Sequence, residues 1–364
     1  MPCGPSVHPS RPRRWAAVPL GLACLLGCLP SPAPVARPAL PARVLLIAPS
    51  GWPADVERYQ RGLARLRAAG FQVVHADRGL RRSQRFAGTE DERVQDLNDL
   101  CDPAGPMPDL VMLPRGGYGA VHLLDRIDYA RLCPRLKAAG TVVMGYSDFT
   151  ALAMALLARG GVVTWSGPMV STELGAPAPD PAMVDSLRNG ITQPVVRIRV
   201  DQPQVGAGTF QGRFWGGNLT TLAALAGTPY LPDIRGGLLF LEDDGETPYR
   251  VDRMLFQLYH AGILGRQKAI LLGAFTNTRP DLAAPDYTLE RVVDSFRART
   301  GIPIFAGLPS GHIPDQHALP VGGQGKLQAG PDGFTLTLTG HPYLRRPPVG
   351  LADPAWLGSV DAGS

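Results

Sequence analysis

Residues 42–76 read ARVLLIAPSGWPADVERYQRGLARLRAAGFQVVHA. The apolar run ARVLLIA stops at Pro49-Ser50-Gly51, a pattern that predicts a buried strand followed by a turn. The next segment, ADVERYQRGLARLRAAG, has apolar residues at helical spacing and closes on Gly70. FQVVHA then predicts a second strand. A strand, a helix and a strand in this order predict a βαβ unit with two parallel strands.

The same alternation continues to about residue 170. The pattern predicts a helix at 88–101 and strands at 109–114 and 141–146. We therefore expect an N-terminal α/β domain over 43–170, with a doubly wound, flavodoxin-like parallel sheet that helices cover on both faces. Reactive residues collect at the carboxyl ends of the strands in such sheets. The loops expected at those ends are PSG, RGGYG and YSD.

The rest of the chain predicts a second domain. Residues 171–207 contain APAPDP and a polar run, so we expect them to connect the two domains. A C-terminal α/β domain with β-hairpin elements is expected over 208–345, followed by a tail over 346–364. Within it, residues 210–227 are typical of a loop that enters a helix, and a hairpin is expected around Gly330-Pro331-Asp332-Gly333. Further strands and helices are expected at 236–244, 248–264, 269–275, 290–300 and 302–307.

The first 27 residues combine a basic start with a short apolar stretch, as export signals do. Leu25-Leu26-Gly27-Cys28 resembles a bacterial lipobox, so Cys28 is the expected lipidation site and residues 28–42 a proline-rich tether. This predicts a lipid-anchored protein of the cell envelope. Two alternatives stay open: Arg13-Arg14 belongs to a twin-arginine signal, or the true start lies further downstream and the protein is cytoplasmic.

Composition narrows the classes of partner and cofactor. The formal net charge of +5 falls to +2 when Arg11, Arg13 and Arg14 leave with the leader, and no other segment has the basic run that nucleic-acid binding needs. Five cysteines show no C-x-x-C spacing, and Cys101 and Cys133 are expected to be ordinary core thiols. We expect neither a metal nor an organic cofactor.

Three polar side chains stand where predicted apolar strands end or in a glycine-rich loop: Ser147, Glu242 and His312. A serine, a histidine and a carboxylate are the residue types of a nucleophilic triad. Each also has a structural alternative. Ser147 could simply cap the helix that follows it, because GYSDF lacks the second glycine of a G-x-S-x-G elbow. Glu242 could belong to a solvated acidic turn or a Mg²⁺ or Ca²⁺ site, and His312 to a structural loop or a metal site with Asp315 and His317.

The glycine-rich loop 115–119, RGGYG, is a candidate oxyanion hole. It matches neither G-x-G-x-x-G nor G-x-x-x-x-G-K, so a phosphate-binding loop is not predicted. Glycines let backbone N–H groups approach a developing negative charge, which is the requirement of an oxyanion hole.

Read together, PRGGYGA, GYSDFTAL, WGGNLTTL, LEDDGETPYRVDRMLFQLYHAGIL and GH…ALPVGG resemble the L,D-carboxypeptidase family, the S66 serine peptidases. The resemblance runs from about residue 43 to about residue 342, with the motifs in the family's order. It implies Ser147 as nucleophile, Glu242 as acid and His312 as base. It also implies an oxyanion hole made by the backbone amides of Gly117 and Asp148. The resemblance further implies a homodimer.

The implied reaction is release of the terminal D-alanine from a murein tetrapeptide, in peptidoglycan recycling or remodelling. An exopeptidase of this kind binds a substrate carboxylate, for which Arg115 and Arg250 are candidates, and Trp215 is a candidate for lining the cleft. One alternative inside the family is a self-immunity peptidase acting on microcin-C-type antibiotics. Another, from a different class, is a lipoprotein that binds murein peptides without cutting them.

Overall fold

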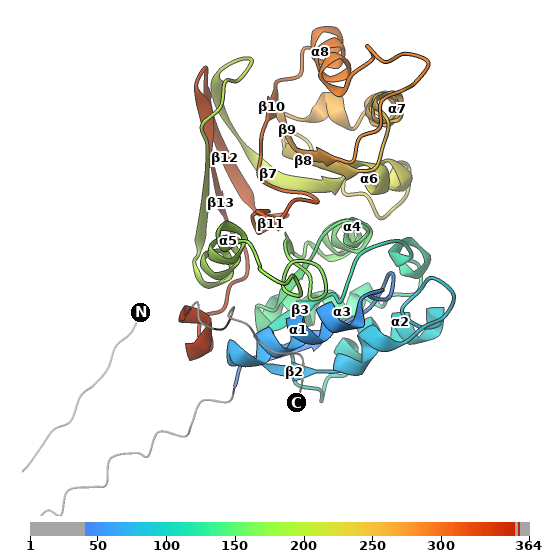
Figure 1. Cartoon of the computed structure of the whole chain (residues 1–364), viewed down its shortest axis with the longest axis vertical. Helices are drawn as coiled ribbons and strands as arrows, with labels where there is room; N and C mark the ends of the chain where they lie inside the picture. The colour runs from blue at the N-terminus through green and yellow to red at the C-terminus, as the bar shows by residue number, and fades with distance from the viewer. Residues whose placement is uncertain (1–40, 354–355, 357–364) are drawn as a thin grey trace, which may run out of the picture. The chain divides into compact units, whose positions relative to one another are not determined.

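Strand β1 (Arg43–Leu46), helix α1 (Val56–Ala68) and strand β2 (Gln72–Val74) form the βαβ unit that the sequence predicts, with Val44 level with Val73 in a parallel register. The structure is a computed structural model that describes residues 41–353 and residue 356. The described residues belong to one compact unit with two sheets (Figure 1). The export segment and Cys28 lie outside the described residues.

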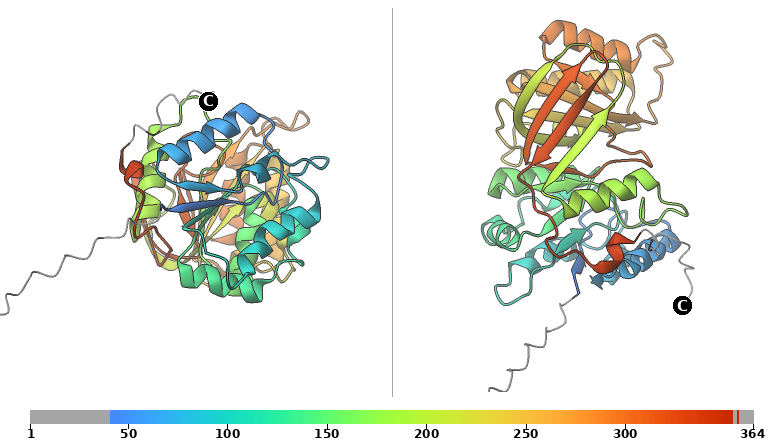
Figure 2. Two further views of the ribbon diagram at one scale, coloured as in Figure 1. Left: turned by 90° about the horizontal axis from the view of Figure 1, so that it is seen from below. Right: turned by 90° about the vertical axis from the view of Figure 1, so that its left-hand side faces the viewer.

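The first sheet has six strands in the order β11-β5-β4-β3-β1-β2. All neighbours are parallel except β11, which runs antiparallel to β5. Helix α1 lies on one side of the sheet and α2 and α3 on the other (Figure 2, left), so the expected doubly wound domain is confirmed. The remaining elements of this part are β3 (Leu110–Met112), β4 (Val142–Gly145), β5 (Thr164–Ser166), β11 (Leu319–Val321), α2 (Glu90–Asn98), α3 (Tyr129–Ala139), α4 (Phe149–Gly160) and α5 (Pro181–Thr192).

Local chemistry explains where these helices begin and end. Asp55 and Asp128 accept backbone N–H groups in the first turns of α1 and α3, and Thr89 forms a reciprocal capping box with Glu92 at the start of α2. Such caps satisfy the unpaired donors of a first turn and are worth about 1 kcal/mol each. Gly140 and Gly161, with φ values of 67° and 62°, end α3 and α4 in the left-handed conformation that glycine adopts without strain.

The second sheet has seven strands in the order β10-β9-β8-β7-β12-β13-β6. Strands β7 to β10 pair in parallel, whereas β12, β13 and β6 pair antiparallel, with the predicted hairpin closing at the Gly330–Gly333 pair (Figure 2, right). The elements are β6 (Val195–Val200), β7 (Gly208–Asn218), β8 (Leu238–Asp244), β9 (Ala269–Thr276), β10 (Ile304–Ala306), β12 (Gln324–Gly330), β13 (Gly333–Thr339), α6 (Leu219–Leu225), α7 (Pro248–His260) and α8 (Leu289–Thr300). Five short 3₁₀ helices span Ala76–Leu80, Asp99–Cys101, Ala120–Leu123, Leu264–Arg266 and Val349–Ala352.

Two segments differ from the expectation. Residues 171–207, expected as a connection, contain helix α5 and strand β6, and β6 is the edge strand of the second sheet. Residues 210–218, expected as a loop, belong to β7, the strand where the parallel and antiparallel halves of that sheet meet. In addition, β11 comes from the C-terminal half of the chain but extends the first sheet, so the two halves of the chain are interlocked.

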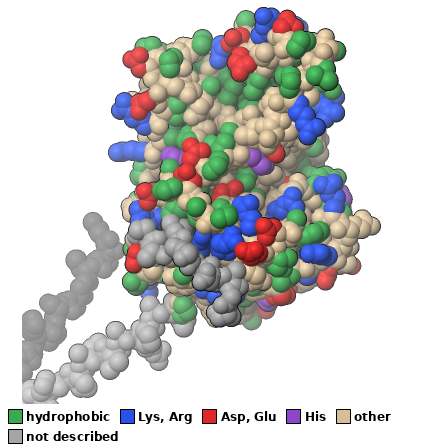
Figure 3. All heavy atoms as spheres, viewed as in Figure 1, with side chains coloured by type: hydrophobic (Ala, Val, Ile, Leu, Met, Phe, Trp, Pro, Cys, Tyr) green, Lys and Arg blue, Asp and Glu red, His purple; other side chains and the backbone are tan. Residues whose placement is uncertain are grey.

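Apolar side chains form the core, and most charged side chains lie on the surface. Apolar side chains of both sheets and their helices are buried, and Cys101 and Cys133 are buried free thiols. On the face shown in Figure 3, acidic and basic side chains are interspersed. In the part of the chain that the structure describes, no helix has the length and apolar character of a membrane span.

Candidate active site

Ser147 lies in the turn between strand β4 and helix α4, at the carboxyl end of the first sheet. Its φ of 63° places it in the left-handed region, where a residue with a side chain is strained by about 1 kcal/mol or more. Gly116 fits tightly beside it, because a Cβ on that glycine would lie 3.1 Å from the Cβ of Ser147. The surrounding loops therefore hold Ser147 in a left-handed conformation that is unfavourable for a residue with a side chain.

The helix-cap alternative for Ser147 is not what the structure shows. Asp148 occupies the N-cap position of α4, and no side-chain cap hydrogen bond is present there. The carboxylate of Asp148 is turned the other way, where it accepts hydrogen bonds from Ser50 Oγ at 2.6 Å and from the amide of Ala120 at 2.8 Å. These bonds connect the Ser147 turn to two neighbouring strand-end loops.

Glu242 and His312 come from the second half of the chain and form a pair. Glu242 lies in the buried part of β8, where the pairing with β9 shifts register between Leu241 and Asp243. Such a shift re-aims a side chain. Oε2 of Glu242 lies 2.9 Å from Nδ1 of His312, and Glu242 is only 2% exposed. A buried carboxylate on Nδ1 fixes the tautomer in which Nε2 has the free lone pair.

The environment of His312 sets its basicity. Burial lowers its pKa, but the hydrogen bond and charge of Glu242, with the charges of Asp244 and Asp243, outweigh burial and raise the pKa above the usual value. The ring also packs edge-on against Tyr146, with centroids 5.0 Å apart. Tyr146 in turn donates a 2.7 Å hydrogen bond to Glu173.

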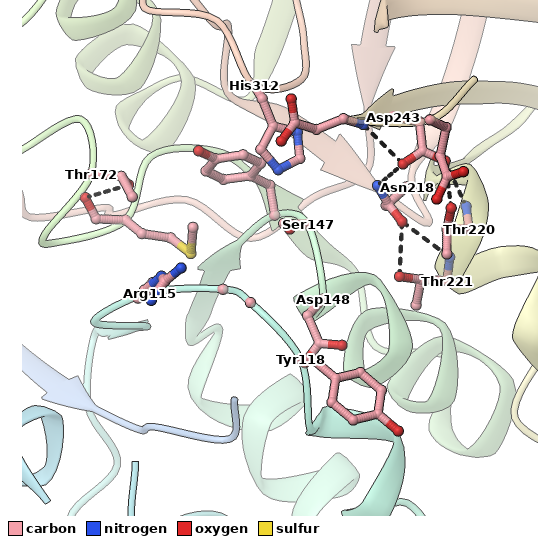
Figure 4. A pocket seen from close by; sticks show the side chains of 16 residues that line it. Arg115, Tyr118, Ser147, Asp148, Thr172, Asn218, Thr220, Thr221, Asp243 and His312 are labelled. Atoms are coloured by element: carbon pink, nitrogen blue, oxygen red, sulfur yellow. Dashed lines mark hydrogen bonds between the residues drawn. The ribbon is translucent and has the colours of Figure 1, made fainter. Parts of the chain in front are cut away.

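Ser147 and His312 line one cavity of about 410 Å³. Figure 4 shows Ser147 near its middle, His312 above, Arg115 and Thr172 on one side, and Asn218, Thr220 and Asp243 on the other. A second cavity of about 400 Å³ shares Tyr146, Thr172 and His312 with the first. Both volumes lie in the range of small-ligand sites. The structure thus brings the predicted nucleophile and base from different sheets to one concave surface.

The amides predicted as an oxyanion hole are available. Gly117 and Asp148 both line the cavity. Among the described residues, neither backbone N–H has a hydrogen-bond acceptor within the protein. Gly117 has a φ of 107°, a conformation that favours glycine. Two free N–H groups beside a serine can stabilise a developing negative charge.

One wall of the cavity is lined by acidic residues of the stretch for which the sequence allowed a solvated turn as one alternative. Asp243 is buried and accepts hydrogen bonds from Asn218 Nδ2 and from the amide and hydroxyl of Thr220. Burial raises its pKa above the usual value. Asp244 and Glu246 also line the cavity. Asp243 thus holds the start of α6 through Asn218 and Thr220. Hydrophobic periodicity could not predict these contacts, because they arise from the pairing of β7 with β8.

The remaining predicted site residues divide into two groups. Arg115 is exposed and lines the cavity. Trp215 does not reach it: the indole is 1% exposed and donates to Gln267 Oε1, so the expectation that it lines the cleft is wrong. Arg250 lies outside the cavity lining and pairs at 3.6 Å with Glu246, which does line the cavity.

Metal binding has no obvious ligand set here. In the described residues, no group of three or more His, Cys, Asp or Glu side chains is arranged to hold an ion. The alternative of a metal site formed by His312, Asp315 and His317 is therefore not supported by the arrangement of these side chains.

Comparisons with known proteins identify the family. Residues 44–167 match the LD-carboxypeptidase N-terminal domain, and residues 211–327 match the LD-carboxypeptidase C-terminal domain. The murein tetrapeptide carboxypeptidase of Pseudomonas aeruginosa is 35% identical over 299 residues, which cover 77% of this chain and 91% of that protein. The chain belongs to the LD-carboxypeptidase family. Membership makes it a peptidase, a hydrolase of peptide bonds.

Two further relatives show the breadth of this LD-carboxypeptidase family. The crystal structure of muramoyltetrapeptide carboxypeptidase from Oxalobacter formigenes superimposes with a TM-score of 0.76 at 35% identity, over 83% of this chain and all of that one. The microcin C7 self-immunity protein MccF of Escherichia coli is 26% identical over 300 residues, 73% of this chain and 83% of that protein. The family and the fold predicted from the motifs are therefore confirmed.

Proposed function

We propose that this LD-carboxypeptidase is a serine enzyme that releases the terminal D-alanine of murein tetrapeptides by cutting an L,D peptide bond. The observation that carries the proposal is the Glu242–His312 pair beside a cavity that also holds Ser147 in a left-handed turn. The murein tetrapeptide carboxypeptidase of Pseudomonas aeruginosa supports the choice of substrate.

The chemistry uses only side chains and amides of this chain. Ser147 Oγ attacks the carbonyl carbon of the L,D bond while His312 Nε2 takes its proton. The amides of Gly117 and Asp148 stabilise the oxyanion of the tetrahedral intermediate. The intermediate collapses, the carbon–nitrogen bond breaks, and the amine of D-alanine leaves with the proton from His312. Water, deprotonated by the same histidine, then hydrolyses the acyl-enzyme and restores Ser147.

Arg115 is the proposed partner of the D-alanine carboxylate. Its guanidinium lines the cavity, and Nη1 donates to the carbonyl of Trp52 at 3.2 Å, which holds the arm in place. A planar guanidinium can bond both oxygens of a carboxylate. The adjoining cavity past Tyr146 gives room for the rest of the tetrapeptide.

The decisive experiment measures D-alanine release from a purified muropeptide tetrapeptide. We expect the unaltered chain to release D-alanine and Ser147→Ala to lose activity by at least about 10³-fold, with circular dichroism and melting temperature unchanged. An acylating probe should add its mass at Ser147 in the unaltered chain only. Full activity of Ser147→Ala would reject the mechanism, and tight peptide binding without release would identify a binding protein instead.

A self-immunity peptidase is the second candidate, favoured by the similarity to MccF over 73% of this chain. It would use the same serine and histidine on an aminoacyl-nucleotide. Parallel rate measurements on the tetrapeptide and on an aminoacyl sulfamoyl adenosine distinguish the two. A higher kcat/KM on the nucleotide would replace the murein proposal.

We further propose that the mature protein is held at the cell envelope through a lipid on Cys28. The lipobox-like Leu25-Leu26-Gly27-Cys28 supports this proposal. Mass spectrometry of the mature N-terminus tests it. A diacylglyceryl cysteine is expected, and an intact leader or a start after Cys28 would contradict it.

A further inference from the structure

Three exposed arginines lie in neighbouring loops: Arg115, which lines the cavity, and Arg82 and Arg85, which do not line it themselves. Within residues 41–353 and 356, none of the three lies at ion-pair distance from a carboxylate. Their neighbours Arg78 and Arg81, by contrast, are paired with Asp96. Of the four arginines between residues 78 and 85, Arg78 and Arg81 thus pair with a carboxylate, whereas Arg82 and Arg85 have no such partner in the described part of the chain.

Aromatic rings hold the unpaired arginines. The guanidinium carbon of Arg82 lies 3.8 Å from the ring centroid of Trp52, and that of Arg85 lies 5.2 Å from the centroid of Tyr118. Both distances are within the range of a cation–π contact. Tyr118 lines the cavity, and the carbonyl of Trp52 accepts the hydrogen bond from Arg115. Each arginine is therefore linked through one aromatic residue to the cavity wall.

The loops that present these side chains pack directly on the nucleophile turn. The amide of Gly51 donates to Gly116 O at 3.1 Å, and Gly51 also forms a β-bridge with Phe86. Gly116 in turn lies so close to Ser147 that a Cβ on the glycine would be 3.3 Å from the serine Oγ. The stretches 49–53, 81–88 and 113–120 contain no Asp or Glu, so no acidic side chain of these loops neutralises the arginines.

We propose that Arg82 and Arg85 form a rim that binds a carboxylate of the substrate other than its C-terminal one. Arg115 takes the terminal carboxylate, and the rim, defined as Arg82 and Arg85 with Trp52 and Tyr118, selects peptides with a further negative charge. The inference rests on the proposed peptidase function and specifies its substrate class as anionic peptides. Exposed charges near a cleft act mainly on capture of the substrate, so the rim raises kcat/KM more than kcat.

The test compares two tetrapeptides of the same sequence, one with its internal carboxylates free and one with them converted to carboxamides. For the free-acid peptide, Arg82→Gln/Arg85→Gln should lower kcat/KM roughly threefold to tenfold at low salt, with kcat nearly unchanged. For the carboxamide peptide the loss should stay below about twofold, and about 0.5 M NaCl should remove the difference between the peptides.

Arg197→Gln/Arg213→Gln is the matched control, because both arginines are exposed, lie on the second sheet, have no ion pair among the described residues and do not line the cavity. This control should keep the preference for the free acid. An unchanged preference in the rim variant would overturn the proposal. So would weaker binding of the rim variant to anionic phospholipid vesicles with unchanged peptide kinetics, which would assign the rim to a membrane surface.

A failure of the proposed function gives a different result. If the unaltered chain releases no D-alanine from either peptide, the proposed reaction is rejected. The binding of peptides by the rim is then tested by calorimetry alone. The rim variant should then bind the free-acid peptide roughly threefold to tenfold more weakly than the unaltered chain, and the carboxamide peptide about equally. Equal affinities of both chains for both peptides would reject the rim independently of any activity.

Discussion

Nδ1 of His312 lies 2.9 Å from Oε2 of Glu242, although 70 positions separate the two residues in the chain. Glu242 lies in the buried part of β8, and His312 lies in the loop between β10 and β11. The carboxylate has its other oxygen buried without a hydrogen-bond partner in the described part of the chain. Among the described residues, His312 is therefore the one hydrogen-bond partner of this buried carboxylate.

Glu242→Gln should shift the pH dependence of catalysis. The pKa of His312 is raised despite its burial, mainly by the hydrogen bond and charge of Glu242. A general base works only when neutral, so activity is lost as pH falls through this raised pKa. Removing the carboxylate charge lowers the pKa, so the acid limb of kcat/KM should move to lower pH while the maximal rate falls about 10²-fold to 10⁴-fold.

Asp244→Asn is the control for this prediction, since Asp244 also contributes to the raised pKa but does not touch the ring. It should move the acid limb in the same direction by less and leave most of the rate. An acid limb that stays at the same pH in Glu242→Gln would show that a group other than His312 controls it.

Gly116→Ala should damage catalysis more than folding. The new methyl group would lie 3.1 Å from Ser147 Cβ and 3.3 Å from its Oγ, closer than ordinary van der Waals contact. Because a displacement of the nucleophile by a fraction of an ångström is costly, we expect kcat to fall about tenfold to 100-fold. The measurement is kcat beside the melting temperature. Gly265→Ala, whose methyl group meets only Tyr259 at 3.8 Å, should leave both unchanged.

Tyr146 and Glu173 are predicted to position His312. Glu173 accepts the hydroxyl of Tyr146 at 2.7 Å and the amide of Met169 at 3.0 Å, so the tyrosine ring is fixed against the imidazole. Tyr146→Phe keeps the ring and loses one hydrogen bond, worth about 1 kcal/mol. We expect kcat to fall about threefold to tenfold with KM unchanged, and the acid limb to shift.

Glu173→Gln tests the same contact from its other end, because an amide oxygen can still accept from Tyr146. It should therefore retain more activity than Tyr146→Phe. Equal kcat in all three proteins, with only the melting temperature altered, would assign the contact a purely structural role.

Local patterns predicted strands β1 to β4 of the first sheet, because each belongs to an apolar run, but not β5 (TWS) or β11 (LPV), which have only three residues each. Strand β7 was missed for a physical reason. Its glycines look like loop residues, but a Cβ on Gly216 would lie 2.0 Å from Phe240 O, and one on Gly217 would lie 2.6 Å from Thr150 Oγ1. These glycines allow β7 to pack closely against β8 and α4. The sequence pattern cannot reveal this, because the neighbouring elements are known only from the fold. Strand β6, VVRIRV, alternates exposed and buried residues as a half-buried strand does, but it lies in a polar segment whose composition predicts a connection.

The site was predictable only as far as the family motifs reach. Ser147, Glu242 and His312 come from motifs whose order in the chain the resemblance supplied. Trp215 was misplaced because the motif shows a tryptophan beside glycines, whereas its burial is decided by pairing of β7 with β8. Glu173 lies in a stretch read as a connection, and only the folded structure brings it to Tyr146.

His341 should make the protein sensitive to acid. The ring is buried, packs on Trp165 with centroids 4.8 Å apart, and has no hydrogen-bond partner among the described residues for either nitrogen. Burial lowers its pKa from 6.5 to about 4. Between these values the unfolded chain binds a proton that the folded chain does not. The free energy of unfolding should therefore fall as pH drops from 6.5 to 4, by about 3 kcal/mol at most.

His341→Phe removes this titration while keeping an aromatic ring on Trp165. Urea unfolding at pH 7, 5.5 and 4.5 should show a shallower loss of stability for this variant than for the unaltered chain. His260→Gln removes an exposed histidine and should keep the original slope. Identical slopes for His341→Phe and the unaltered chain would mean that the buried ring is not what the acid protonates, because a proton taken up only by the unfolded state must appear in the slope.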